Sequence, residues 1–194
     1  MTDYISAEQF ILSKLKKELP QNLTYHGLLH VYDVLEAAMR IAGAEKVTEE
    51  ERNLIRIAVV IHDSGFITLY RGHEEKGCDL ARQILPQYGF SGQQIETING
   101  MIMATRLPQQ PHAKLERIIA DADLDYLGRE DFYTIGNTLF SEFIEYGFVK
   151  NEREWNELQL KFLRNHHYHT SYCKKLREGE KQQRILEIEK LLND

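Results

Sequence analysis

The sequence has few of the residues that mark several classes of protein. Cysteine occurs only twice, as Cys78 and Cys173, which excludes a disulfide scaffold, and we expect a reducing compartment, the cytoplasm. With four prolines and twelve glycines the chain is neither a collagen nor a Pro/Gly-rich disordered protein. No apolar run reaches the roughly 18 residues of a membrane-spanning helix. The first ten residues contain Asp3 and Glu8 but no basic stretch, so we expect no signal peptide.

An excess of positive charge is missing as well. The chain has 30 acidic and 24 basic residues, a formal net charge of −6. A protein that coats nucleic acid or anionic lipid needs the opposite sign, so we expect neither a nucleic acid polymer nor a membrane as partner. A small phosphorylated substrate is compatible with this charge where a local cation receives it. The sequence leaves a homo-oligomer open.

Apolar residues at helical spacing are present along most of the chain. Hydrophobic residues make up 42% of it, enough for one buried core in a domain of this size. Because no segment alternates like a strand between hairpin turns, we expect an all-α fold in a single domain over residues 1–194. The predicted helices cover residues 5–19, 28–42, 48–61, 74–88, 92–105, 114–127, 130–146, 152–164 and 170–192.

Two of these segments could also be interpreted in another way. The apolar run at 57–61 could by itself be a buried strand, but Thr48 and Glu51 upstream have the spacing of a capping box, which favours a buried helix. The stretch 174–194 is highly charged, with Leu and Ile at helical spacing. We predict a surface helix there rather than a separate domain.

Several histidines and aspartates have the spacing of ligands. His26 and His30 are four residues apart, which places them on one face of a helix. Asp33 would lie on the same side and could accept the second ring proton of a ligand histidine. His62 and Asp63 directly follow the apolar run at 57–61. A carboxylate there is costly unless it is paired or binds a metal, whereas the alternative is a helix end that emerges into water.

A third acidic group follows the apolar pair Ile118-Ile119. Asp121, Asp123 and Asp125 repel one another unless a cation is near, although a solvated acidic turn is the simpler interpretation. Taken together, the three sites supply two imidazoles and two carboxylates. This set suits Mn²⁺, Fe²⁺, Co²⁺, Ni²⁺ or Zn²⁺, and Mg²⁺ also stays open. It leaves coordination positions for water and substrate.

These residues occur in the order of a known family. The chain resembles the HD-domain superfamily of metal-dependent phosphohydrolases in three stretches, Tyr25-His26-Gly27-Leu28-Leu29-His30-Val31-Tyr32-Asp33-Val34, His62-Asp63 and Ala122-Asp123-Leu124. The first and last are also similar to signatures of class I cyclic-nucleotide phosphodiesterases, and the pattern at 121–128 is similar to that of small bacterial HD phosphohydrolases. The resemblance covers about residues 22–175. It implies an HD helical bundle with a core at about 22–150 and C-terminal helices at about 151–194.

The resemblance also implies roles for individual residues. His30, His62, Asp63 and Asp123 would bind the metal, with Asp121 as second choice for the last ligand. Asp63 would orient the attacking water, and His26 would protonate the leaving oxygen. His73 lies where many HD proteins have another histidine or acid, so it would bind a second metal or a substrate phosphate, or simply cap the next helix.

The chain departs from the family pattern in one place that matters for substrate binding. Many HD proteins have lysine after His-Asp-x-Gly, but Phe66 stands there in this chain. Arg71 or Arg106 would then bind the phosphate. The histidines of the segment 165–170 resemble a C-terminal element of the same group and could edge the pocket, but we predict a solvated helix junction. His112 has no predicted role.

The expected function is metal-dependent hydrolysis of a phosphate ester, either a monoester or a cyclic diester, of a small metabolite or nucleotide. The main alternative is a regulatory HD protein that binds a nucleotide or a metal without turnover, since a fold can keep a pocket and lose its chemistry. A third possibility is an HD oxygenase with a di-iron centre, which would need more ligands than the sequence places.

Overall fold

The computed structural model describes residues 2–193. Within that range the chain forms nine α-helices and three short 3₁₀ helices and no strand, so the all-α prediction is confirmed. In chain order the elements are α1 (Tyr4–Glu18), α2 (Leu28–Ala44), α3 (Glu49–Ile61), η1 (Ser64–Ile67), α4 (His73–Ile84), η2 (Leu85–Tyr88), α5 (Gly92–Ala104), α6 (Lys114–Asp123), η3 (Asp125–Gly128), α7 (Phe132–Glu145), α8 (Glu152–Asn165) and α9 (Ser171–Asn193).

Helix α3 lies at the centre of the first apolar core. Its N-terminus has the capping box expected from the sequence, in which Thr48 and Glu51 each bind the other's backbone N–H. The run Ile57–Ile61 is fully buried, because α1, α2, α5 and α6 pack around it. The C-terminal part of α3 is surrounded in this way and is apolar on every side, which explains why the run Ile57–Ile61 also resembled a buried strand.

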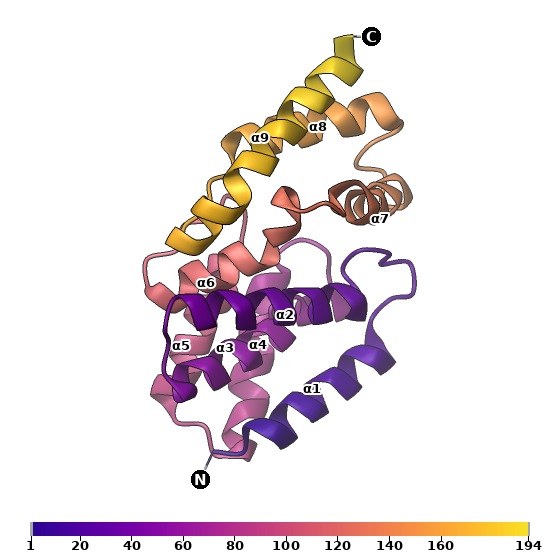
Figure 1. Cartoon of the computed structure of the whole chain (residues 1–194). Helices are drawn as coiled ribbons and strands as arrows, with labels where there is room; N and C mark the ends of the chain where they lie inside the picture. The colour runs from indigo at the N-terminus through magenta and orange to yellow at the C-terminus, as the bar shows by residue number, and fades with distance from the viewer. Residues whose placement is uncertain (1, 194) are drawn as a thin grey trace.

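A second apolar core joins the C-terminal helices to the rest of the chain. Leu127 of η3 and Phe132 of α7 pack with Leu163 of α8 and Ile188 of α9. Figure 1 shows α7, α8 and α9 together beyond α6, with α8 and α9 side by side. The surface helix predicted at 174–194 is confirmed as far as Asn193, the last described residue, since α9 has an exposed charged side and only one buried side, which contains Ile185 and Ile188.

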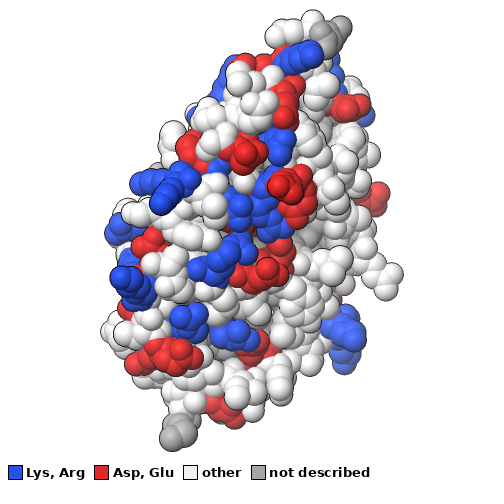
Figure 2. All heavy atoms as spheres, viewed as in Figure 1, with Lys and Arg blue, Asp and Glu red and all other residues white. Residues whose placement is uncertain are grey.

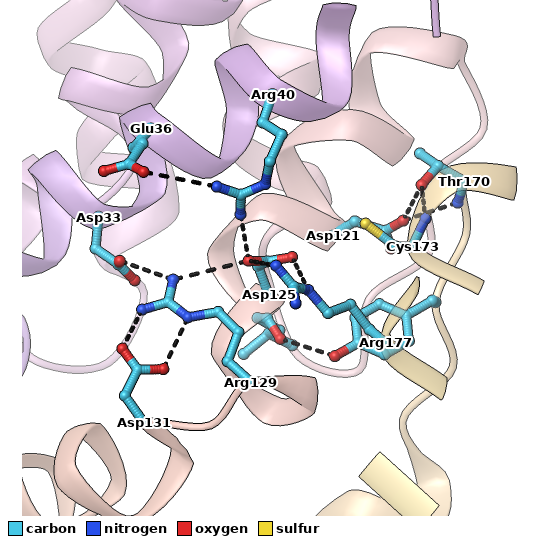
Figure 3. A network of polar contacts seen from close by, with 12 residues as sticks. Asp33, Glu36, Arg40, Asp121, Asp125, Arg129, Asp131, Thr170, Cys173 and Arg177 are labelled. Atoms are coloured by element: carbon cyan, nitrogen blue, oxygen red, sulfur yellow. Dashed lines mark hydrogen bonds and ion pairs between the residues drawn. The ribbon is translucent and has the colours of Figure 1, made fainter. Parts of the chain in front are cut away.

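A buried carboxylate fixes this C-terminal part to α2. Asp125 of η3 is completely buried, and its oxygens accept hydrogen bonds from Arg40 of α2 at 2.6 Å and from Arg177 of α9 at 2.8 Å (Figure 3). Arg129 lies 3.7 Å from the same carboxylate and donates to Asp33 at 2.8 Å. The proposal that Asp33 accepts a proton from a ligand histidine is therefore wrong, because Asp33 points to Arg129.

Two predicted helices are shorter than their apolar periodicity suggested. The segment predicted as 74–88 ends as an α-helix at Ile84 and continues as η2, which has Pro86 in its first turn. The segment predicted as 114–127 ends at Asp123, where Leu124 has φ −114° and ψ 17° and the chain turns into η3. This break leaves Asp123 at the end of α6.

Gly65 allows η1 to contact the start of α4. A Cβ atom at this position would lie 2.0 Å from the carbonyl oxygen of His73, so no other residue fits without moving the backbone. The close approach brings His73 beside the end of α3, near His62 and Asp63.

The surface carries both signs of charge. On the face shown in Figure 2, basic and acidic side chains are intermixed rather than gathered in one basic area. Across residues 2–193, no helix combines the length and the hydropathy that crossing a membrane requires.

Candidate metal centre

The four residues predicted to bind metal lie at the ends of three helices. His30 is in the first turn of α2, His62 and Asp63 directly follow α3, and Asp123 is the last residue of α6. His30, His62 and Asp123 each present one ligand atom, and these atoms lie within 4.8 Å of one another. Oδ2 of Asp63 is 3.2 Å from Nε2 of His62 and 3.5 Å from Nε2 of His30. The fold thus gathers all four side chains into one cluster.

Two buried atoms in this cluster have no hydrogen-bond partner within the described chain. Nδ1 of His62 donates to the carbonyl oxygen of Val59 at 2.7 Å, which leaves Nε2 as the atom that faces the cluster. Nε2 of His62 and Oδ2 of Asp63 are both buried and unpartnered, although they face each other. Such atoms are rare in a native interior, because each costs free energy. A divalent cation between them would satisfy both, so the residues present fit a metal.

The electrostatics of the cluster also favour a cation. Burial would lower the pKa of His62, but Asp63 and Asp123 outweigh it and raise this pKa well above its usual value. Burial would raise the pKa of Asp123, yet contacts with His30 and His62 lower it to about 2. The pKa of Asp63 is also far below its usual range, because the adjacent His62 outweighs burial. Both carboxylates are therefore ionised at neutral pH and attract positive charge.

His26 lies beside the cluster, but not on the helix. Helix α2 begins at Leu28, so His26 is in the preceding turn, and the prediction that it shares a helix face with His30 is wrong. Its ring centroid is nevertheless 6.0 Å from that of His30. The turn keeps His26 close to His30 because Glu142 of α7 binds the backbone of this turn. Oε2 of Glu142 accepts the backbone N–H groups of Tyr25 at 2.8 Å and of His26 at 3.1 Å.

The side chain of His26 is held by the same carboxylate. Nδ1 of His26 lies 2.5 Å from Oε1 of Glu142, which also accepts the hydroxyl of Tyr70 at 2.7 Å. Burial would raise the pKa of Glu142, but the hydrogen bonds from His26, Tyr70 and Tyr25 outweigh it and lower this pKa. An ionised Glu142 therefore fixes the His26 ring with Nδ1 toward α7, and Nε2 remains for a substrate.

Sequence reasoning missed Glu142. Its signal was a single acid on an apolar helix face, since Ile135, Leu139 and Glu142 follow the i, i+4, i+7 spacing. A buried acid of this kind needs a partner, and the partner is far away in the sequence.

Phe66, which stands where many HD proteins have lysine, packs against two histidines of the site. Its ring stacks on His26, with centroids 4.2 Å apart, and on His73 at 4.0 Å. Nδ1 of His73 lies 3.0 Å from the carbonyl oxygen of Tyr70, so Nε2 faces Asp63, 3.6 Å from Oδ1. His73 is the first residue of α4, and its ring borders the cluster. This position is compatible with the predicted binding of a substrate phosphate or a second metal.

The two predicted phosphate-binding arginines both line the cavity above the cluster, but they differ. Arg106 forms an ion pair with Glu75. Arg71 lies over the ring of Phe148, 5.8 Å from its centroid, and forms no ion pair with any residue of 2–193. Arg71 is therefore the better placed of the two to receive an anion.

Asp121 has a structural task outside the cluster. Its oxygens accept the backbone N–H groups of His169 and Thr170 at 2.8 Å and the hydroxyl of Thr170 at 2.6 Å, and burial raises its pKa. These bonds fasten the chain before α9 to α6, and they use both oxygens, so Asp121 is not the ligand.

The prediction of a solvated junction at 165–170 is wrong, because Asp121 holds this segment against α6. His166, Tyr168 and Thr170 are buried, whereas His167 is exposed. Burial is the largest cause that lowers the pKa of His166, to about 3, and the positive charge of Lys181 adds to it. His112 is exposed and uses only its backbone, donating to Glu116.

The comparison with known proteins agrees with this geometry. A model of the HD domain family matches residues 27–125, just over half of the chain, and the chain belongs to that family. The match contains His30, His62, Asp63 and Asp123. No curated protein matches the sequence significantly.

Two solved structures share the fold over nearly the whole chain. A predicted HD superfamily hydrolase from an uncultured Thermotogales bacterium has a TM-score of 0.63 and 20% identity, over 95% of this chain and 91% of that one. YpgQ from Bacillus subtilis, in complex with ADP, has a TM-score of 0.64 and 16% identity, over 96% of this chain and 95% of that one. At these identities the likeness establishes the fold, including the C-terminal helices outside the family match.

Proposed function

We propose that this protein hydrolyses a phosphate ester of a small phosphorylated metabolite or nucleotide, with a divalent metal held by His30, His62, Asp63 and Asp123. The observation that carries the proposal is the pair of buried, unpartnered atoms Nε2 of His62 and Oδ2 of Asp63. Asp63 and Asp123 also line a cavity of about 600 Å³, so a ligand can reach the cluster. Mononuclear hydrolytic sites have this combination of buried ligands and an open side.

The residues of the chain would divide the work. A bound divalent metal supplies Lewis acidity and lowers the pKa of water. Asp63, which faces both the cluster and the cavity, orients the attacking water. His26 gives the proton on Nε2 to the leaving oxygen while Glu142 holds Nδ1. Arg71 offsets the charge of the phosphate.

The relatives support this assignment by their names and ligands. One similar structure is a predicted HD superfamily hydrolase, and the other holds ADP, a phosphorylated ligand. The Glu142–His26 pair favours turnover over the regulatory alternative. A protein that only binds its ligand does not need a proton donor held beside the predicted metal ligands.

The test is phosphate release from a panel of phosphorylated metabolites, with Mn²⁺, Co²⁺, Ni²⁺ and Mg²⁺ supplied in turn. The expected result is metal-dependent release that His62→Ala abolishes and His112→Ala leaves unchanged, because His112 is exposed and makes only backbone contacts. Binding of metal and phosphorylated ligand with no release under any metal would overturn the proposal in favour of the regulatory alternative.

A further inference from the structure

The cavity extends well beyond the metal cluster, and its far side is apolar. Near the cluster it is lined by charged and polar side chains such as Asp63, His73 and Arg71. The remaining wall comes from η3, α7 and α8 and consists mainly of apolar side chains, among them Leu127, Phe132, Phe143, Trp155, Phe162 and Leu163. Trp155, which is 5% exposed, fixes this wall because its ring packs on Phe140 and Phe143.

We propose that this wall receives the apolar part of the substrate, so that the substrate is a phosphate ester of an extended apolar alcohol. The inference rests on the proposed function and narrows it. The phosphoryl group would lie at the cluster beside Arg71, and the alkyl or aromatic group would lie against Trp155 and Phe162. The volume of about 600 Å³ is in the range of pockets that enclose a drug-sized ligand.

The wall offers few partners to a polar group. Its side chains with a polar atom are Tyr126, Trp155 and Gln159, and Thr105 borders it at the end of α5. The hydroxyl of Thr105 donates to the carbonyl oxygen of Ile102 at 2.8 Å, and Nε2 of Gln159 donates to Asn156 at 3.4 Å. A nucleobase or sugar placed there would replace few of the hydrogen bonds to water that it loses, whereas an apolar group loses none.

The charges near the cluster limit the number of phosphates. Arg106 is held by Glu75, which leaves Arg71 as the cavity's arginine without an acidic partner among residues 2–193. Asp63, Glu74 and Asp123 line the same end of the cavity and add negative charge. One phosphoryl group, shared between Arg71 and a metal, suits this balance better than a polyphosphate chain does.

The reaction balances without any further reagent. The oxygen of water forms the new bond to phosphorus, and the bond from phosphorus to the alcohol oxygen breaks. The leaving oxygen takes the proton from Nε2 of His26, and a proton from the attacking water restores it. The products are inorganic phosphate and the apolar alcohol.

The test uses n-alkylphosphonates from ethyl to octyl, which have no ester bond and cannot be hydrolysed. Their binding is followed by calorimetry and by the emission of Trp155, the sole tryptophan of the chain. We expect affinity to rise about fourfold with each methylene that the cavity buries, with a shift of Trp155 emission. Octylphosphonate should also bind at least tenfold more tightly than adenosine monophosphate.

A matched pair of variants locates the effect. Phe162→Gln should weaken octylphosphonate binding about tenfold or more and leave ethylphosphonate unchanged, whereas Phe10→Gln, at an exposed position on α1, should change neither. Affinity that does not depend on chain length, or tighter binding of the nucleotide, would overturn the inference.

Hydrolysis of p-nitrophenyl phosphate with added metal separates the two proposals. If hydrolysis requires metal but phosphonate affinity does not depend on the length of the alkyl chain, only the inference of an apolar substrate is overturned. If phosphonate affinity rises with the length of the alkyl chain but no ester is hydrolysed, the proposed function is overturned and the assignment of the apolar pocket still stands.

Discussion

Nδ1 of His26 lies 2.5 Å from Oε1 of Glu142, although 116 residues separate the two in the chain. Glu142 is completely buried and also accepts the backbone N–H of His26, so one carboxylate fixes both the turn and the ring. The ring of His26 also stacks on the ring of Phe66. A histidine restrained in this way presents one nitrogen, Nε2, in one direction.

The first prediction concerns this pair. His26→Ala should keep metal and fold but lower kcat by about 10²–10⁴-fold for a substrate with a poor leaving group, because the proposed proton donor is then missing. The loss should shrink for p-nitrophenyl phosphate, whose leaving group needs no proton. Loss of metal in this variant would instead make His26 a ligand.

Glu142→Gln tests the positioning role separately. We expect a smaller loss of kcat, about 10–100-fold, with the same dependence on leaving group and an altered pH profile. Carboxylate partners of metal-binding histidines contribute this much, and Glu142 orients His26 in the same way. Glu145→Gln, at an exposed position near the end of the same helix, is the control and should be unchanged. Equal losses for good and poor leaving groups would mean that Glu142 acts only on the fold.

The second prediction is metal content. Protein purified without chelator should contain up to one equivalent of a transition metal, and His62→Ala, Asp63→Ala and Asp123→Ala should lose it. Metal that binds only the folded state stabilises it by about 2.7 kcal/mol at a concentration of 100 times Kd, so added metal should raise the Tm of the wild type but not of these variants. Wild-type metal content in His62→Ala and Asp123→Ala would contradict the assigned site.

The third prediction separates the two arginines. Arg71→Ala should raise KM about tenfold or more without changing metal content, because hydrogen bonds to charged groups contribute this much. Arg106→Ala should have a smaller effect, since Glu75 already holds that side chain. Arg153→Ala, at a position 70% exposed on α8, is the control. An unchanged KM in both cavity variants would rule out either arginine as the phosphate ligand.

The fourth prediction follows from His166, whose pKa is lowered from 6.5 to about 3, chiefly by burial. Below its usual pKa the unfolded chain binds a proton at this residue and the folded chain does not, so the free energy of unfolding decreases as pH falls. The contribution is complete above pH 6.5 and is lost by at most about 1.4 kcal/mol per pH unit below it.

Urea unfolding at pH 7.5 and pH 5.0 checks this directly. His166→Phe should reduce the difference in stability between the two conditions, whereas His167→Phe, at the exposed neighbouring position, should not. The same pH dependence in wild type and His166→Phe would show that other groups cause the acid sensitivity.

Much of the fold follows from local sequence. Helix α3 could be predicted because its capping box and its apolar run lie within fourteen residues of one another, from Thr48 to Ile61, and both act within one helix. The order of His30, His62-Asp63 and Asp123 could also be read directly, and each stands at the edge of an apolar run. Local signals of this kind need no knowledge of which helices meet.

The remaining features depend on packing between distant segments. Asp33 and Asp121 lie near ligands in sequence yet bind Arg129 and Thr170, because the direction of a side chain on a helix and the element that faces it decide its partner. Glu142 meets His26 only because α7 packs over the turn before α2. The apolar cavity wall likewise forms only where side chains of η3, α7 and α8 come together. The sequence by itself determined the helices and the candidate ligands, whereas tertiary packing decided the proton donor's partner and the shape of the substrate pocket, since periodicity specifies the buried face of a helix but not what that face contacts.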